Sequence, residues 1–205
     1  MDAIQISHEI SEARRAIRRG GGLVRTSEAM RDGIPSRVLY AMRDRGLLES
    51  LGRGLFRLSE LPPLSDPDLV TVALRAPKAV VCLVSALSFH GITTQIPHAV
   101  EIALARGAEP PRIDHPPVKT YWFSGKAFTE GVETHSIDGV PVQVYGVEKA
   151  LADCFKYRNK LGMETVLEAL RFYRDRKTVH LDELGRHAEN CRVARVMRPY
   201  LETIL

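Results

Sequence analysis

The sequence has few cysteines and no long apolar stretch. Its three cysteines are odd in number, stand singly among apolar residues and form no Cys-x-x-Cys pair: Cys82, Cys154 and Cys191. They are therefore expected to be reduced core thiols, as in a cytoplasmic protein, and not a disulfide framework. The best apolar run, Ala79 to Leu87, is far shorter than a membrane span, and the N-terminus lacks the apolar segment of a signal peptide. The sequence thus predicts no membrane contact.

Several catalytic signatures are also missing. The triplet Gly20-Gly21-Gly22 follows an expected helix instead of a strand and lacks the Gly-Lys-Ser/Thr of a phosphate-binding loop. Ser85 and Ser88 lie near a histidine, but no Gly-x-Ser-x-Gly surrounds either of them. Metal-ligand spacing is absent among the scattered histidines His90, His98, His115 and His135. The sequence therefore predicts no catalytic residue, no cofactor and no metal site.

One acidic pair needs separate treatment. Ser65-Asp66-Pro67-Asp68-Leu69 superficially matches the element of nucleotidyltransferases in which two carboxylates hold Mg²⁺. No Gly-Ser pair lies upstream to hold phosphate, and Pro67 suits the first position of a helix capped by Asp66. We interpret the segment as a helix start, and a nucleotidyltransferase-type enzyme in the C-terminal part stays an alternative.

Positive charge is concentrated near the N-terminus. The 205 residues carry a formal net charge of +4, yet eleven arginines and four acidic residues between Arg14 and Arg57 give that segment +7. Residues 1–13 contribute −3 and the remainder of the chain is neutral. A localised cationic face of this kind is typical of contact with nucleic acid phosphates.

The stretch from Ile34 to Leu58 predicts a short helix and a tight hairpin. Pro35 suits the first helical position, and Gly46 suits the left-handed residue that ends a helix. Apolar residues on both sides of Gly52-Arg53-Gly54 indicate a hairpin with a basic tip. At 100° per residue the helix separates two faces. One carries Pro35, Val38, Leu39, Met42 and Gly46, and the other Ser36, Arg37, Tyr40, Arg43 and Asp44.

Two further helices precede this stretch. Ser7 is expected to cap a helix from His8 to Arg19 with a buried stripe of Ile6, Ile10, Ala13 and Ile17. Thr26 or Ser27 is expected to cap a second helix that ends near Arg31. Helix, helix, turn, helix and hairpin follow in the order of a winged helix-turn-helix.

The remaining chain predicts an α+β fold: the winged helix-turn-helix, then a mixed α/β domain that ends in a helical bundle-like tail. Leu61-Pro62-Pro63-Leu64 indicates a linker and therefore domains at 1–60 and 61–205. A small sheet is expected within 79–145 and helices within 147–205. Alternating strands are predicted at 101–105, 118–123, 133–137 and 140–145, with Asp138-Gly139 as a hairpin turn, and Ser85 is expected to open a short helix. Lys149 and Asp153, four residues apart on an expected helix, are expected to form an ion pair, and the alternative is that they belong to the antitoxin surface.

Eight side chains of the first domain are candidate DNA contacts. Arginine grips guanine with two parallel donors, and hydroxyl groups near helix N-termini bind phosphates. Reading of bases is expected from Ser36, Arg37, Tyr40 and Arg43, and phosphate contact from Thr26, Ser27, Arg53 and Arg57.

Several segments together resemble one known family, the AbiEi antitoxins. They are the winged N-terminus, the segment from Ala76 to Ile92 with its Cys-Leu-x-Ser-Ala-Leu-x-x-His-Gly pattern, the segment from Val144 to Asp153, and Tyr157 to Gly162. The resemblance implies a bacterial type IV toxin–antitoxin system in phage defence. It implies a winged helix that represses its own operon by binding inverted repeats in the promoter. It further implies a C-terminal domain that counters a nucleotidyltransferase toxin without a stable complex.

The sequence leaves three functions to be separated. They are the autorepressor and antitoxin, a regulator of another operon that uses its C-terminal part for dimerisation, and the enzyme named above. A monomer that binds each repeat cooperatively and a preformed dimer both agree with the sequence.

Overall fold

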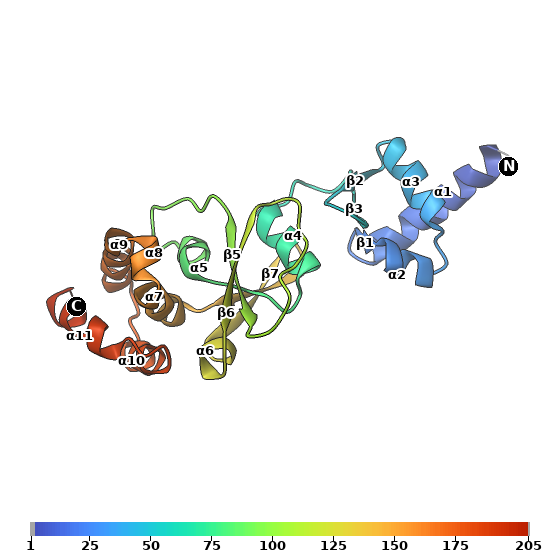
Figure 1. The fold of residues 1–205 in the computed structure, drawn as a ribbon. Coiled ribbons are helices and arrows are strands. Elements are labelled where there is room, and N and C mark those ends of the chain that lie inside the picture. Colours follow the sequence, from blue (N-terminus) through green and yellow to red (C-terminus); the bar gives the residue numbers. More distant parts are fainter. Residues whose placement is uncertain (1–2, 205) are drawn as a thin grey trace. The chain divides into compact units, whose positions relative to one another are not determined.

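The computed structural model describes residues 3–204 and divides the chain into two compact units between Ser65 and Asp66. The boundary expected from the linker lies slightly earlier, after residue 60. The first unit is a winged helix-turn-helix (Figure 1). Its elements are α1 (Ala3–Arg19), β1 (Leu23–Arg25), α2 (Thr26–Arg31), α3 (Ser36–Asp44), β2 (Leu48–Ser50) and β3 (Leu55–Leu58).

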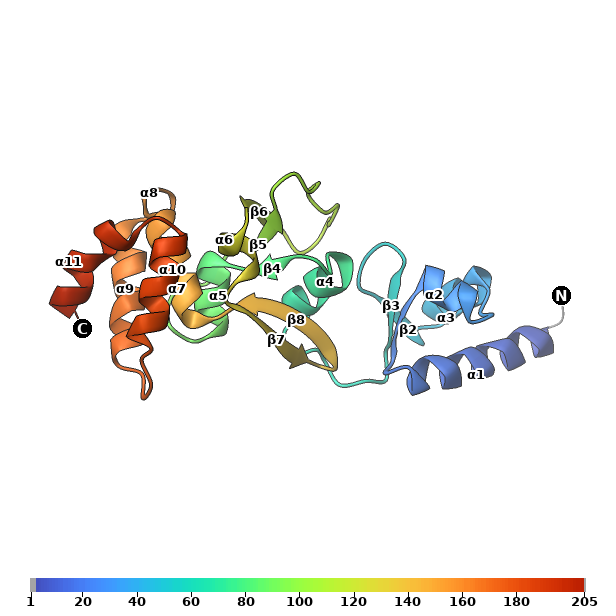
Figure 2. The same ribbon diagram turned by 90° about the horizontal axis from the view of Figure 1, so that it is seen from below.

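One apolar core holds the first unit together. Its strands form an antiparallel sheet in the order β1-β3-β2, which lies to one side of the helices (Figure 2). The predicted stripe of α1 and the apolar face of α3 meet in this core with the wing strands. The buried side chains are Ile10, Ala13, Ile17, Val24, Ala29, Val38, Leu39, Met42, Leu48, Phe56 and Leu58. Burial of these residues is the main force that fixes α3 against α1.

Two predicted helix starts in the first unit are wrong. Helix α1 begins at Ala3 and not after Ser7, because Ile6 continues the apolar stripe one turn earlier and packs on the core. Helix α2 is capped by Arg25 and not by Thr26 or Ser27. The cause is β1, which pairs with β3 up to Arg25 and leaves the N–H of Thr26 to donate to Gly54 O at 2.9 Å.

The second unit is a mixed five-stranded sheet with helices, which confirms the α+β class. Its first elements are α4 (Pro67–Arg75), β4 (Val80–Val81), α5 (Leu83–Phe89), β5 (Val100–Ala105), β6 (Val118–Phe123), α6 (Lys126–Thr129), β7 (Val132–Ile137) and β8 (Val140–Tyr145). The strand order is β6-β5-β4-β8-β7, and the β5–β6 and β4–β8 pairs are parallel. Asp138 and Gly139 have φ of 50° and 81°, as a two-residue hairpin turn requires.

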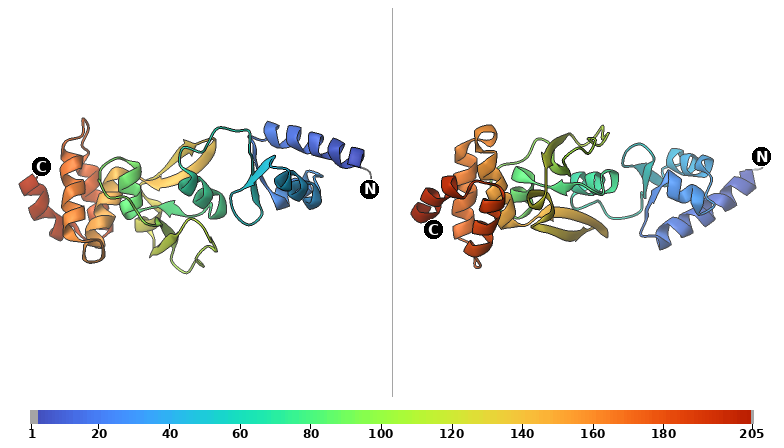
Figure 3. Two further views of the ribbon diagram at one scale, coloured as in Figure 1. Left: turned by 90° about the horizontal axis from the view of Figure 1, so that it is seen from above. Right: turned by 60° about the horizontal axis from the view of Figure 1, so that its bottom comes forward.

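The tail consists of five helices that lie at one end of the second unit, away from the β7–β8 turn (Figures 2 and 3). They are α7 (Val147–Lys156), α8 (Arg158–Leu161), α9 (Met163–Arg174), α10 (Leu181–Asn190) and α11 (Ala194–Ile204). Helix α7 packs on α5, whereas α9 and α10 pack on α7 and α11 packs on both of them. The tail also contacts the sheet, because Lys149 of α7 lies over the ring of Tyr145 on β8. Helices α7 and α8 are separated at Tyr157, whose ring packs on Tyr121 and Phe123.

A long-range cap positions α5. The helix begins at Leu83, so Ser85 does not open it. The carboxylate of buried Glu101 on β5 instead accepts from Val84 N at 2.8 Å, and Ser85 Oγ accepts from Glu101 N at 2.9 Å. These bonds attach α5 to the sheet and fix the direction in which the helix leads to His90.

The three cysteines are buried and form no disulfide bond, as expected for reduced core thiols. Burial raises the pKa of the Cys82 and Cys154 thiols well above its ordinary value, so both are protonated at neutral pH. Within residues 3–204, no helix combines the length and the apolar character needed to cross a bilayer.

Candidate nucleic-acid interface

Helix α3 has the two faces that its sequence predicts. Val38, Leu39 and Met42 are buried in the core of the first unit. On the opposite face Arg37, Tyr40, Arg43 and Asp44 are exposed, and Ser36 is half-buried. Pro35 is the N-cap residue of the helix, whereas the prediction made it the first helical residue. Gly46 follows the helix with φ of 71°. The helix is held by one face and offers the other to solvent.

Arg37 is oriented by helix α1. Its Nη2 lies 2.9 Å from Glu9 Oε1, in an ion pair whose side chains are 43% and 25% exposed. Glu9 comes from the face of α1 that packs beside α3, so the pair also links the two helices. The Arg37 side chain is therefore held beside α1 and remains partly in solvent.

Tyr40 and Arg43 form a stacked pair on the exposed face. The Arg43 guanidinium lies 5.0 Å from the centre of the Tyr40 ring, within the range of a cation–π contact. The Tyr40 ring in turn meets Phe56 of the wing edge to face, with centres 5.9 Å apart. Arg43 Nη2 also lies 2.8 Å from Asp44 Oδ1. The wing therefore supports Tyr40, and Tyr40 together with Asp44 restricts the directions that Arg43 adopts.

The wing hairpin brings Arg53 to an exposed turn. Gly52 and Gly54 on its two sides have φ of 126° and 70°, a conformation that glycine adopts without strain. Thr26 lies under this turn, where its hydroxyl is within 3.4 Å of Gly54 O, so it attaches the wing to α2. Ser27, the next residue, is exposed at the start of α2.

Arg57 departs from its predicted role as a phosphate contact. It is only 5% exposed, on the strand β3 that lies in the middle of the three-stranded sheet. Its Nη1 lies 2.7 Å from Glu49 Oε1, and its Nη2 donates to Pro62 O. Because both ends of the guanidinium are engaged inside the unit, Arg57 links the wing to the segment that follows it.

The arginines at the end of α1 surround one acid. Arg14 and Arg18 both pair with Glu60, whose side chain is 22% exposed. Arg15 and Arg19 are exposed beside them. One carboxylate contributes a single negative charge against these four positive charges, so the end of α1 keeps a positive excess.

The chemical signatures weighed in the second unit have structural roles. Asp66 caps α4 by accepting from Leu69 N at 2.9 Å, with Pro67 at the first helical position, which confirms the helix-start interpretation. The predicted ion pair of Lys149 with Asp153 is present and buried, with side chains 0% and 1% exposed. Lys149 Nζ also lies 4.2 Å from the centre of the Tyr145 ring. Burial raises the pKa of Asp153, and the charge of Lys149 opposes that shift.

The structure brings together three residues that the sequence did not associate. His90, Glu133 and His135 each direct a potential ligand atom toward the others, and these atoms all lie within 4.8 Å of one another. Spacing in the sequence did not predict this cluster. Glu133 and His135 alternate on one predicted strand and so share a face, which is the one signal that the sequence holds. Burial lowers the pKa of His90, which favours its neutral ring.

The comparisons with known proteins agree with the winged helix-turn-helix assigned to the first unit. Residues 11–59 match the family model described as "Transcriptional regulator, AbiEi antitoxin". The crystal structure of the RV2827C protein from Mycobacterium tuberculosis is similar, with a TM-score of 0.58 and 14% sequence identity over 95% of this chain and 81% of that one. At this identity the similarity concerns the fold alone. No curated protein sequence matches the chain.

The matched segment runs from within α1 to the end of β3 and so contains α2, the exposed face of α3 and the whole wing. The family match and the geometry of these elements agree, and the winged helix-turn-helix of this chain is similar to that of the AbiEi antitoxin family of transcriptional regulators.

Proposed function

We propose that the chain is a DNA-binding autorepressor and the antitoxin of a type IV toxin–antitoxin system. The observation that carries the first half is the exposed face of α3, where Arg37 and Arg43 stand about one and two-thirds turns apart on either side of Tyr40. Such a face fits the major groove, in which the guanidinium fork of arginine matches the two acceptors of guanine.

The surrounding charges suit the DNA backbone. Arg53 at the wing tip, the exposed hydroxyl of Ser27 and the arginines at the end of α1 are candidates for phosphate contact. Thr26 is a weaker candidate, because its N–H and hydroxyl already meet Gly54. Arg57 is not included, because it is buried. In this arrangement the phosphate contacts supply most of the affinity, and α3 supplies the choice of sequence.

Binding requires Arg37 to exchange or share its partner. In the absence of DNA its Nη2 pairs with Glu9, and among the described residues Glu9 Oε2 is buried without a hydrogen-bond partner. The carboxylate of Glu9 therefore repels approaching phosphates while it orients the arginine. On DNA binding we expect the Arg37 guanidinium to exchange or share its present contacts in favour of a base edge, because its planar fork matches paired acceptors.

The test is a gel-shift titration of the full chain with the DNA upstream of its own gene. The double variant Arg37→Ala with Arg43→Ala is expected to lose the specific shift, and loss of a bidentate contact costs about 1–3 kcal/mol for each arginine. Arg186→Ala is the matched control, because it removes an exposed, acid-paired arginine from the second unit. Equal affinity of the double variant and the wild-type chain would contradict the proposal.

The second half of the proposal assigns antitoxin activity to residues 66–205. It assigns no catalytic reaction to them. Its support is the resemblance and the capping role of Asp66, whose Oδ1 accepts from Leu69 N. The proposed partner is a nucleotidyltransferase toxin encoded next to this gene, countered without a stable complex. Co-expression with that neighbour should restore growth, while co-purification should yield no complex. Failure to restore growth would favour a regulator of another operon.

A further inference from the structure

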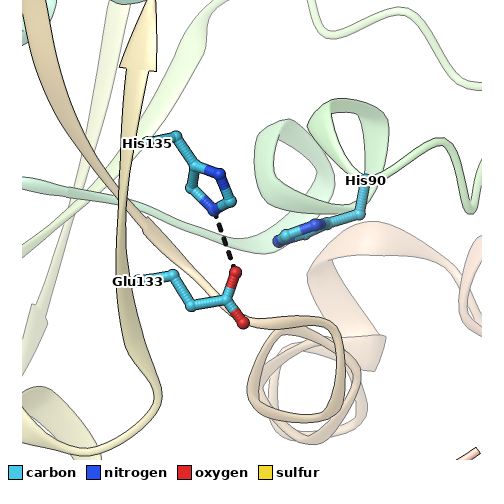
Figure 4. Close-up of side chains that lie close together, drawn as sticks. All are labelled: His90, Glu133 and His135. Atoms are coloured by element: carbon cyan, nitrogen blue, oxygen red, sulfur yellow. Dashed lines mark hydrogen bonds and ion pairs between the residues drawn. The ribbon is translucent and has the colours of Figure 1, made fainter.

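Three side chains meet on the second unit beside the sheet edge. His90 directly follows α5, and Glu133 and His135 lie two residues apart on β7, the terminal strand of the sheet. Figure 4 shows the imidazole rings and the carboxylate facing a common space between the helix and the strand. One ring nitrogen of each histidine and one carboxylate oxygen lie within 4.8 Å of one another.

We propose that His90, Glu133 and His135 form a binding site for a divalent transition-metal ion, with Zn²⁺ as the best fit. Two imidazoles and one carboxylate are a donor set that such ions prefer, whereas Mg²⁺ and Ca²⁺ prefer oxygen ligands alone. With three protein ligands the fourth tetrahedral position is open to water.

The distances fit an ion after a small adjustment. His135 Nε2 and Glu133 Oε2 are 2.9 Å apart. Ligand atoms about 2.0–2.1 Å from a tetrahedral zinc are roughly 3.3 Å apart. On binding, the distance between His135 Nε2 and Glu133 Oε2 would therefore increase slightly, and the largest distance within the cluster would decrease. The side chains of His135 and Glu133 are 35% and 49% exposed, so rotation toward the ion meets little packing. The ion also has access from solvent.

The protein supplies the support that a ligating histidine usually has. His90 Nε2 lies 2.8 Å from the carbonyl oxygen of Tyr145, which only accepts, so Nε2 carries the proton in this bond. The neutral ring then has its lone pair on Nδ1. Ligation through Nδ1 keeps the Tyr145 bond, and this combination fixes ring orientation and tautomer in known metal sites. Ligation through Nε2 replaces that bond.

The backbone leaves room for the carboxylate at Gly146. A β-carbon at that position would lie 2.6 Å from Glu133 Oε1, although the backbone there has an ordinary φ of −58°. Glycine is therefore needed for space and not for conformation. The rival explanation is an ion pair of His135 with Glu133 beside a cluster of the Phe89, His90 and His135 rings, and the metal titration below separates the two.

A bound ion would cross-link two elements that are distant in sequence. It would attach the edge strand β7 to the end of α5 and so oppose opening of the sheet at that edge. An ion that binds only the folded chain raises its stability in proportion to the logarithm of free ion concentration. The site is thus expected to stabilise the second unit.

The test uses the full chain, freed of metal with a chelator and titrated with Zn²⁺ by calorimetry. We expect one equivalent to bind and a higher unfolding temperature with the ion. His90→Ala and His135→Ala should each weaken binding by more than about 100-fold, because removal of a mere supporting group already costs about 10–100-fold. His98→Ala is the control, since it removes an exposed histidine of the same unit outside the cluster.

Two further measurements keep the test decisive if a histidine variant unfolds. Gly146→Ala should displace the Glu133 carboxylate and weaken binding about tenfold or more without removing a ligand. Co²⁺ added to the wild-type chain should give the intense visible absorption of four-coordinate cobalt. Absence of Zn²⁺ binding, or binding equal in wild type and a folded His90→Ala His135→Ala chain, would overturn the proposal.

Discussion

At the scale of single residues, the exposed arginines differ in what holds them. Arg37 is oriented by an acid from another helix, Arg43 by an aromatic ring and its own neighbour, and Arg57 by burial. The sequence places all three at positions that suit DNA contact. It does not reveal burial of Arg57, because a short strand with apolar neighbours on both sides leaves the facing of its charged residue undetermined.

We predict that Arg57→Ala lowers stability and that Arg53→Ala does not. Loss of Arg57 leaves the carbonyl of Pro62 without its donor and removes a buried stem, so unfolding of the first unit should become easier by about 1–3 kcal/mol. Arg53 lies on the exposed wing turn. Its loss should lower DNA affinity equally for all sequences. Urea denaturation compares the two, and equal stabilities would contradict the assigned role of Arg57.

Buried His187 predicts a pH dependence of stability. It is 1% exposed, and burial, assisted by the charge of Lys149, lowers its pKa. Below about pH 6.5, His187 therefore binds a proton in the unfolded chain but stays neutral in the folded chain. The free energy of unfolding consequently falls as pH decreases. The expected result is a smaller loss of stability between about pH 7 and pH 5 for His187→Gln than for wild type. Parallel pH profiles from denaturant titrations would refute this.

At the scale of elements, strands with alternating residues are the most predictable part. The bounds of β6 and β8 agree with the sequence, because their alternation is uninterrupted and a two-residue turn starts β8. Missed elements depend on distant partners. The short strand β1 exists through pairing with β3, and α5 is capped by Glu101 from another strand. The local preferences of residues for helix or strand do not predict such long-range contacts.

The metal-type cluster shows the same limit at a candidate site. Alternation on β7 predicts that Glu133 and His135 share a face, but His90 reaches them only through the packing of α5 on the sheet. Conversely, the two faces of α3 were predictable because a helix period and a terminating glycine are local properties.

We predict that Gly46→Ala destabilises the turn after α3. Its φ of 71° is costly for a residue with a β-carbon, while no atom lies within 4 Å of that position. The cost is therefore conformational, about 1 kcal/mol. Gly20→Ala is the control, because Gly20 does not have a positive φ and a β-carbon there would make only ordinary van der Waals contacts. A similar unfolding midpoint for both variants would show that the left-handed conformation does not matter.

At the scale of the whole molecule, the two units have separate cores and separate proposed tasks. Residues 1–65 enclose the apolar core that α1, α3 and the wing share, and the proposed DNA contacts all lie within them. Antitoxin activity is assigned to the rest of the chain. Domain organisation at this level follows from the proline-containing linker and the change from arginine-rich to neutral sequence.

We predict that a fragment of residues 1–65 folds alone and binds upstream DNA but does not restore growth in the presence of the toxin. Its core is its own, so circular dichroism should show the helical content of the three helices. The full chain is the positive control in both assays. A fragment that binds no DNA although folded would mean that the second unit contributes to the interface.

The most direct test of the central claim is a fluorescence anisotropy titration that compares two duplexes. One carries the repeats upstream of the gene, and the other is a scrambled sequence of equal length and composition. If α3 reads the bases, Arg37→Ala with Arg43→Ala should lower affinity for the first duplex to that for the second. Wild type should prefer the first by about 1000-fold or more. A double variant that keeps the preference of the wild-type chain would contradict the account.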